Sequence, residues 1–173
     1  MAVFIMNHTR SKGAAKANIR YIQHRPGKDG AKATRSLFGW DGVLGRIDAY
    51  RLVDTAEAGS SFFRMKISPD PKTEDEKRDL HLREVTERTM QAFEERLRKP
   101  VQWVAAEHDD HTAKRHVHVL AIAKGRLNRE DLKGIIREAT GACLEQRQEL
   151  DHTLAQQARG EREEAAWERS HER

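Results

Sequence analysis

Residues 101–123, VQWVAAEHDDHTAKRHVHVLAIA, contain two strand-like segments that decide the fold. Residues 101–107 and 116–123 are rich in Val, Ala and other apolar side chains that are compatible with strands. The second segment begins at Arg115 or His116, so only residues 108–114 or 108–115 separate the two segments, and such a short connection predicts antiparallel neighbours. The second segment is apolar on both faces, because Leu120 and Ile122 alternate with Val and Ala residues. We therefore expect a central strand that is covered on both sides.

The segments on either side of this hairpin extend it into a mixed domain. Apolar periodicity predicts strands at residues 2–8 and 61–68, and helices at residues 14–25, 73–99 and 128–150. Thr73 and Glu76 form a capping box that would open the second of these helices. The order β, α, loop, β, α, β, β, α predicts an α+β sandwich, with an antiparallel sheet of about four to five strands flanked by α-helices.

The chain of 173 residues has the length of one domain. We expect that domain to occupy residues 1–150 and to contain a long, Gly-rich basic loop at 26–60, with a helical turn near residues 43–52. Residues 151–173 are polar and predict a charged C-terminal helix or tail, in which Gly160 is a possible break.

The composition excludes several classes of protein. No run approaches the ~20 apolar residues of a membrane span, so we expect no membrane insertion. The first six residues are apolar but lack the basic lead and the cleavage site of a signal peptide. A single cysteine, Cys143, excludes an internal disulfide framework and a Cys-rich zinc module. A reducing, cytoplasmic setting is the simplest interpretation.

Positive charge is concentrated near the N-terminus. The chain carries a net charge of +4, but residues 10–51 alone contain ten Lys or Arg against three Asp or Glu. Such asymmetry favours a face that meets an anion, most often a nucleic acid. A solvated basic surface is the alternative interpretation.

Three histidines are candidates for one metal site. His116 and His118 occupy alternate positions of a strand, so their rings share one face. His108 ends the paired strand and can be brought beside them, and three neutral imidazoles leave open positions on a bound ion. His111, in the connection, is the alternative third ligand. Three carboxylates could orient a ligand ring by hydrogen bonding or could simply be turn residues, namely Glu107, Asp109 and Asp110, and Asp109 fits a turn better.

Tyr21 is the candidate nucleophile. It lies on the first predicted helix among Arg20, His24 and Arg25. A phenol with a pKa of about 10 is a poor nucleophile at neutral pH, but a nearby cation or metal favours its phenolate. The same positive charges would hold a phosphate. A helix tyrosine packed at the edge of the core remains the alternative.

The order of these motifs resembles the relaxase, or mobilisation nuclease, family of HUH endonucleases. The resemblance is carried by Tyr21-Ile22 in a basic helix after an N-terminal strand, by Phe63-Arg-Met-Lys-Ile-Ser-Pro69, and by Trp103 to His108 leading to Arg115-His-Val-His-Val119. It covers about residues 1–150. The seven residues between His108 and His116 are one more than we expect for many members, which leaves the choice between His108 and His111 open.

The resemblance implies an HUH-type, RRM-like palm and a metal-dependent, site- and strand-specific DNA nicking and rejoining reaction at a transfer origin. Tyr21 would be the nucleophile that becomes linked to the 5′-phosphate, and His108, His116 and His118 would bind a divalent ion, with Mg²⁺ or Mn²⁺ expected. The implied partners are single-stranded or locally melted origin DNA, accessory relaxosome proteins and a coupling protein. The implied setting is the bacterial cytoplasm, with transfer to the recipient cell together with the DNA.

The basic residues near Tyr21 and in the loop are the candidate DNA contacts: Arg20, His24, Arg25, Lys28, Lys32, Arg35 and Arg46. Three other functions compete with the relaxase. In a rolling-circle initiator the tyrosine usually follows the histidine pair, whereas here no tyrosine follows Tyr50. A non-catalytic single-stranded nucleic-acid-binding module would explain the charge but not the three histidines. In a metal hydrolase without a covalent step, Tyr21 would be structural.

Overall fold

A single six-stranded antiparallel sheet forms the centre of the protein, in the order β1-β4-β6-β5-β2-β3. The computed structural model describes residues 3–26, 30, 33–109 and 114–171. The elements are β1 (Val3–Thr9), α1 (Lys12–His24), β2 (Leu37–Gly39), β3 (Gly42–Leu44), α2 (Arg46–Asp54), β4 (Ser61–Ser68), α3 (Leu82–Leu97), β5 (Gln102–His108), β6 (His116–Ala123) and α4 (Arg129–His171). The α+β prediction is therefore confirmed.

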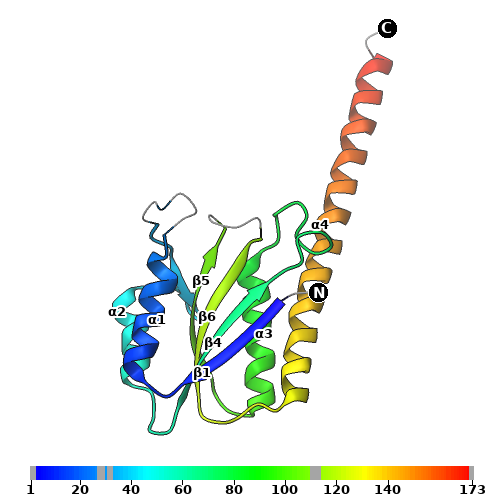
Figure 1. Cartoon of the computed structure of the whole chain (residues 1–173). Helices are drawn as coiled ribbons and strands as arrows, with labels where there is room; N and C mark the ends of the chain where they lie inside the picture. The colour runs from blue at the N-terminus through cyan, green and yellow to red at the C-terminus, as the bar shows by residue number, and fades with distance from the viewer. Residues whose placement is uncertain (1–2, 27–29, 31–32, 110–113, 172–173) are drawn as a thin grey trace.

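The helices cover the two faces of the sheet in pairs (Figure 1). Helices α1 and α2 lie on one face, and α3 and α4 lie on the other. Strand β6 shows why both faces are covered. Leu120 and Ile122 belong to the apolar cluster beneath α1, whereas Val119 and Ala121 belong to the cluster beneath α3 and α4. The prediction of a central strand covered on both sides is confirmed.

Two short strands that were not expected lie within residues 26–60. Strands β2 and β3 form a hairpin that turns at Trp40 and Asp41, and Gly42, the first residue of β3, has a φ of +105° that is readily adopted only by glycine. The hairpin is held to β5 by tertiary contacts, since the Phe38 ring packs edge-on against Trp103 and the Trp40 indole donates a hydrogen bond to the Val101 carbonyl. The segment is thus less loop-like than predicted, and the helical turn expected near 43–52 is the full helix α2.

The capping box at Thr73 and Glu76 does not open a helix. Helix α3 begins at Leu82, and residues 71–78 are turns and bends. The Asp70 carboxylate accepts hydrogen bonds from the backbone N–H groups of Lys72 and Thr73, and this local turn replaces the predicted first helical turn.

Helix α4 runs without interruption from Arg129 to His171, so Gly160 does not break it. Its last anchored turn is near Asp151, whose carboxylate pairs with Lys77 and Arg147. Beyond that turn the helix projects away from the sheet (Figure 1), and nearly all its described side chains are exposed. None of the described helices is long and apolar enough to cross a membrane.

A chain that ends at Asp151 should keep the stability and the activity of the full chain. Residues 152–167 bury almost nothing, and changes at such positions shift the free energy of unfolding by about 0.5 kcal/mol or less. Urea unfolding measures the stability, and retention of labelled single-stranded DNA on the denatured protein measures the activity. A chain that ends at Thr140 is the contrasting control, because it loses the buried side chains of Ala142 and Cys143. Equal destabilisation by both cuts would contradict the prediction.

Candidate metal centre

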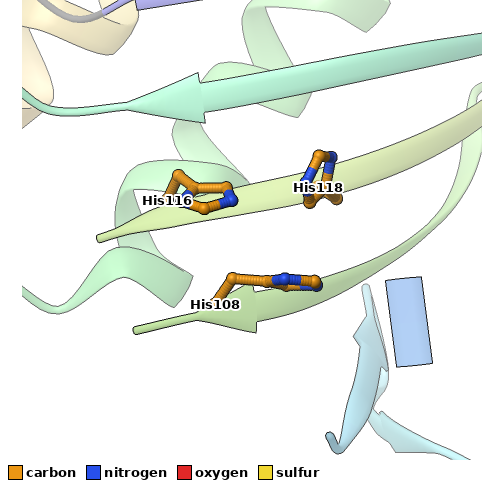
Figure 2. A group of neighbouring side chains, drawn as sticks. All are labelled: His108, His116 and His118. Carbon is orange, nitrogen blue, oxygen red and sulfur yellow. The ribbon is translucent and has the colours of Figure 1, made fainter. Parts of the chain in front are cut away.

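Three histidine rings meet on the α1 face of the sheet (Figure 2). His108 ends β5 and lies directly opposite His116, the first residue of β6, while His118 follows two residues later on the same face. The ring centroids are 5.3 Å apart for His108 and His116, 4.7 Å for His108 and His118, and 5.0 Å for His116 and His118. One ligand nitrogen from each ring lies within 4.8 Å of the others. The three residues could therefore hold one metal ion.

Backbone carbonyls orient two of the rings. Nε2 of His108 lies 2.8 Å from the Ile22 carbonyl oxygen, and Nδ1 of His116 lies 3.1 Å from the Lys114 carbonyl oxygen. A carbonyl only accepts, so both of these nitrogens carry hydrogen. In the neutral rings the lone pairs then lie on Nδ1 of His108 and Nε2 of His116. Such a fixed tautomer is the arrangement that metal-ligating histidines adopt.

The environment keeps His108 neutral. Burial lowers the pKa of His108 to about 3, and the positive charge of Arg35 and the neighbouring His118 act in the same direction. The hydrogen bond to Ile22 opposes this shift only in part. A neutral imidazole is the form that binds a metal ion.

The metal-free protein should lose stability in acid because of His108. The folded pKa lies below the unfolded value of about 6.5, so the unfolded chain binds more protons below that pH. This destabilisation is absent above pH 6.5 and grows as the pH falls towards 3. By pH 4 it should lower the free energy of unfolding by at most about 3 kcal/mol. Urea unfolding of the original protein and of His108→Gln from pH 7 to 4 checks this. The free energy of unfolding should decline less in His108→Gln. Parallel declines in the two proteins would contradict the prediction.

Tyr21 lies beside the histidine cluster and is accessible to solvent. Its ring centroid is 6.3 Å from that of His118, edge-on, and 47% of the residue is exposed. The guanidinium carbon of Arg25 lies 5.6 Å from the centre of the Tyr21 ring. On α1 the buried stripe is Ala15, Ile19 and Ile22, which anchors the helix and leaves Tyr21 beside the cluster. The arrangement brings a phenol, an arginine and three imidazoles together.

The other candidate DNA contacts form two groups. Arg35 donates to the Arg25 carbonyl at 2.8 Å, and its charge acts on His108, so Arg25 and Arg35 both flank the cluster. Further along, Nη1 of Arg46 lies 3.1 Å from Nε2 of His24. Arg20 is exposed on α1. Lys28 and Lys32 lie outside the described residues.

Glu107 does not orient a ligand ring, contrary to one interpretation of the sequence. Side chains alternate along β5, so Glu107 points to the face opposite His108. There it accepts a hydrogen bond from Arg115 at 2.8 Å, and Arg115 also pairs with the buried Asp75. This network ties together the ends of the two strands that carry the histidines. Asp110 and the alternative ligand His111 lie outside the described residues.

Sequence reasoning missed Lys66. In β4 it is the register partner of His118, and it is half-buried. Burial, together with the charges of Arg25 and Lys114, lowers the pKa of Lys66. The alternation of Arg64 and Lys66 with apolar residues marks a polar face of this strand. Only the register shows that Lys66 lies next to His118.

Comparison with models of known protein families, with curated proteins and with solved structures finds no match. The fold and the side-chain geometry therefore carry the functional argument. They define an α+β protein with a three-histidine candidate metal centre. An all-imidazole donor set suits zinc, copper, iron or nickel, and it leaves room for a substrate oxygen.

Proposed function

We propose that the protein is a metal-dependent DNA relaxase that nicks and rejoins one strand at a transfer origin through a covalent 5′-phosphotyrosine. The observation that carries the proposal is the position of Tyr21, an exposed phenol whose ring lies 6.3 Å from His118 in a cluster of three histidines. The order of the motifs in the sequence, which resembles that of relaxases, supports the same conclusion.

In this reaction the Tyr21 oxygen forms a bond to phosphorus, and the bond between phosphorus and the 3′-oxygen breaks. The phenolic proton passes to solvent, and the departing oxygen takes up a proton to become a 3′-hydroxyl. Arg25 and Arg35 hold the phosphate by charge-assisted hydrogen bonds. A divalent ion held by His108, His116 and His118 would polarise the phosphate as a Lewis acid. Mg²⁺ or Mn²⁺ is expected, although three imidazoles bind later transition metals more tightly.

Because the new ester conserves the energy of the broken bond, the reverse reaction can rejoin the strand without a nucleotide. The proposed substrate is single-stranded or locally melted origin DNA. Accessory relaxosome proteins and a coupling protein would be its partners in the bacterial cytoplasm. From there, the protein could pass with the DNA to the recipient cell.

A capture experiment tests this function and finds the origin sequence at the same time. The full chain is incubated with Mn²⁺ and a pool of 3′-labelled single strands of random sequence, then denatured, and protein-bound DNA is recovered and sequenced. A relaxase retains the 3′ label on the denatured protein, enriches one sequence and loses both properties in EDTA. Cleavage without protein-bound label would indicate a metal hydrolase. Binding without cleavage would indicate a binding module.

Neutralising Arg35 and Arg46 should weaken the binding of single-stranded DNA. Each phosphate contact that is lost should reduce the slope of log affinity against log salt by about 0.7. Fluorescence anisotropy of the Arg35→Gln/Arg46→Gln protein across a salt series measures this. The matched control is Arg88→Gln/Lys133→Gln, whose side chains lie on α3 and α4. A slope that changes equally in both proteins would mean that Arg35 and Arg46 make no specific contact with the DNA.

A further inference from the structure

Lys66 projects from the sheet next to the histidine cluster. It pairs with His118 across β4 and β6, and residues directly opposite each other in antiparallel strands point to the same face. The odd-numbered neighbours Met65 and Ile67 belong to the core beneath α3 and α4. The Lys66 side chain therefore lies on the α1 face, where Tyr21 also contacts His118.

Three cations from separate parts of the chain gather at this point. Arg25 at the end of α1 and Lys114 before β6 both lie close enough to repel the charge of Lys66. Burial contributes most to the lowered pKa of Lys66, so its ammonium group is less fully hydrated than one on the open surface. Like charges held together raise the energy of the protein, and a bound anion between them relieves that repulsion.

The neighbouring cation Arg64 provides a contrast. It lies two residues earlier in β4, on the same face, but its Nε donates to the Asn7 side chain at 2.8 Å. Arg64 is paired with Leu120 rather than with a histidine. The two residues thus share strand, face and charge, and only Lys66 adjoins the candidate metal centre.

We propose that Lys66 is a further catalytic residue, whose ammonium group donates a hydrogen bond to a non-bridging oxygen of the phosphate that Tyr21 attacks. This inference rests on the proposed function and adds one group to it. The bond strengthens as negative charge builds on the phosphate oxygens, so it lowers the barrier more than it tightens DNA binding. Most of the affinity comes from the other basic residues.

The kinetic test uses the DNA strand recovered by capture. In single-turnover reactions with Mn²⁺, Lys66→Met should lower the maximal rate by about 10- to 100-fold, while the half-saturating DNA concentration changes by less than about threefold. Lys66→Arg should restore most of the rate, and Arg64→Gln should leave it within about twofold of the original. Mn²⁺ affinity should be equal in all four proteins. A Lys66→Met protein with the original rate would overturn the proposal.

A second readout does not depend on cleavage. Mn²⁺ bound to the protein broadens the ³¹P signal of dimethyl phosphate when that diester lies beside the ion. With protein in excess over Mn²⁺, Lys66→Met should broaden the signal several-fold less than the original protein or Arg64→Gln. Equal broadening would overturn the role of Lys66, even if the original protein captures DNA. If the original protein captures no DNA but Lys66→Met reduces the broadening, the relaxase proposal fails and the phosphate contact stands.

Discussion

A Tyr21→Phe protein should form no covalent adduct with DNA, while its fold, its metal affinity and its DNA binding stay unchanged. The substitution removes one oxygen and keeps the ring that contacts His118 and Arg25. Tyr21 is 47% exposed, so no buried partner is lost. Removing the nucleophile of a covalent mechanism lowers the rate by at least about 10³-fold. The measurement is the retention of the 3′ label on denatured protein, together with cleaved DNA on a sequencing gel.

The second tyrosine of the chain is the matched control. Tyr50 lies on α2, and its ring is 5.7 Å from the ammonium of Lys16, not beside the histidines. Tyr50→Phe should therefore capture DNA as well as the original protein. A Tyr21→Phe protein that still cleaves the strand would show that water is the nucleophile. In that case the site is a metal hydrolase, and Tyr21 serves to position the substrate.

The sequence predicts the centre of the fold better than its periphery. The hairpin of β5 and β6 was predictable because both segments are apolar and the connection is short. Strands β2 and β3 have three residues each and depend on tertiary contacts of Phe38 and Trp40, which leave no periodic pattern. The beginning of α3 was predicted wrongly because the Asp70 carboxylate accepts the Thr73 N–H, which the Glu76 side chain would accept in a capping box, together with the Lys72 N–H.

The same contrast holds for the candidate site. Alternation along one strand places His116 and His118 on one face, and pairing with β5 adds His108. Closeness in sequence suggests a role at the metal for the Glu107 carboxylate, but alternation sends it to the opposite face, where Arg115 binds it. Lys66 is distant in sequence, and only the register of β4 against β6 brings it to His118.

Replacing His118 with Ala should abolish specific metal binding and, with it, adduct formation. The proposed site offers three nitrogen ligands, and losing one should weaken the affinity for the ion by at least about 100-fold, since even the loss of a residue that orients a ligand costs about 10- to 100-fold. His118 is a better choice than His108, whose Nε2 also joins β5 to α1 through the Ile22 carbonyl. A His108 variant would therefore lose both the ion and the hydrogen bond between β5 and α1, and the two effects could not be separated.

Calorimetry with Mn²⁺ and a thermal scan measure the effect. The original protein should gain about 2.7 kcal/mol in stability when Mn²⁺ is present at 100 times its dissociation constant, whereas His118→Ala should gain about 0.4 kcal/mol or less at that concentration. His152→Ala, an exposed histidine of α4, is the control and should behave as the original protein. Unchanged Mn²⁺ affinity in His118→Ala would place the ion elsewhere. If instead His111→Ala loses the ion while His108→Ala keeps it, His111 is the third ligand. The metal would still be bound by His116 and His118, because a site completed by His108 and a site completed by His111 both require these two histidines on one face of the sheet.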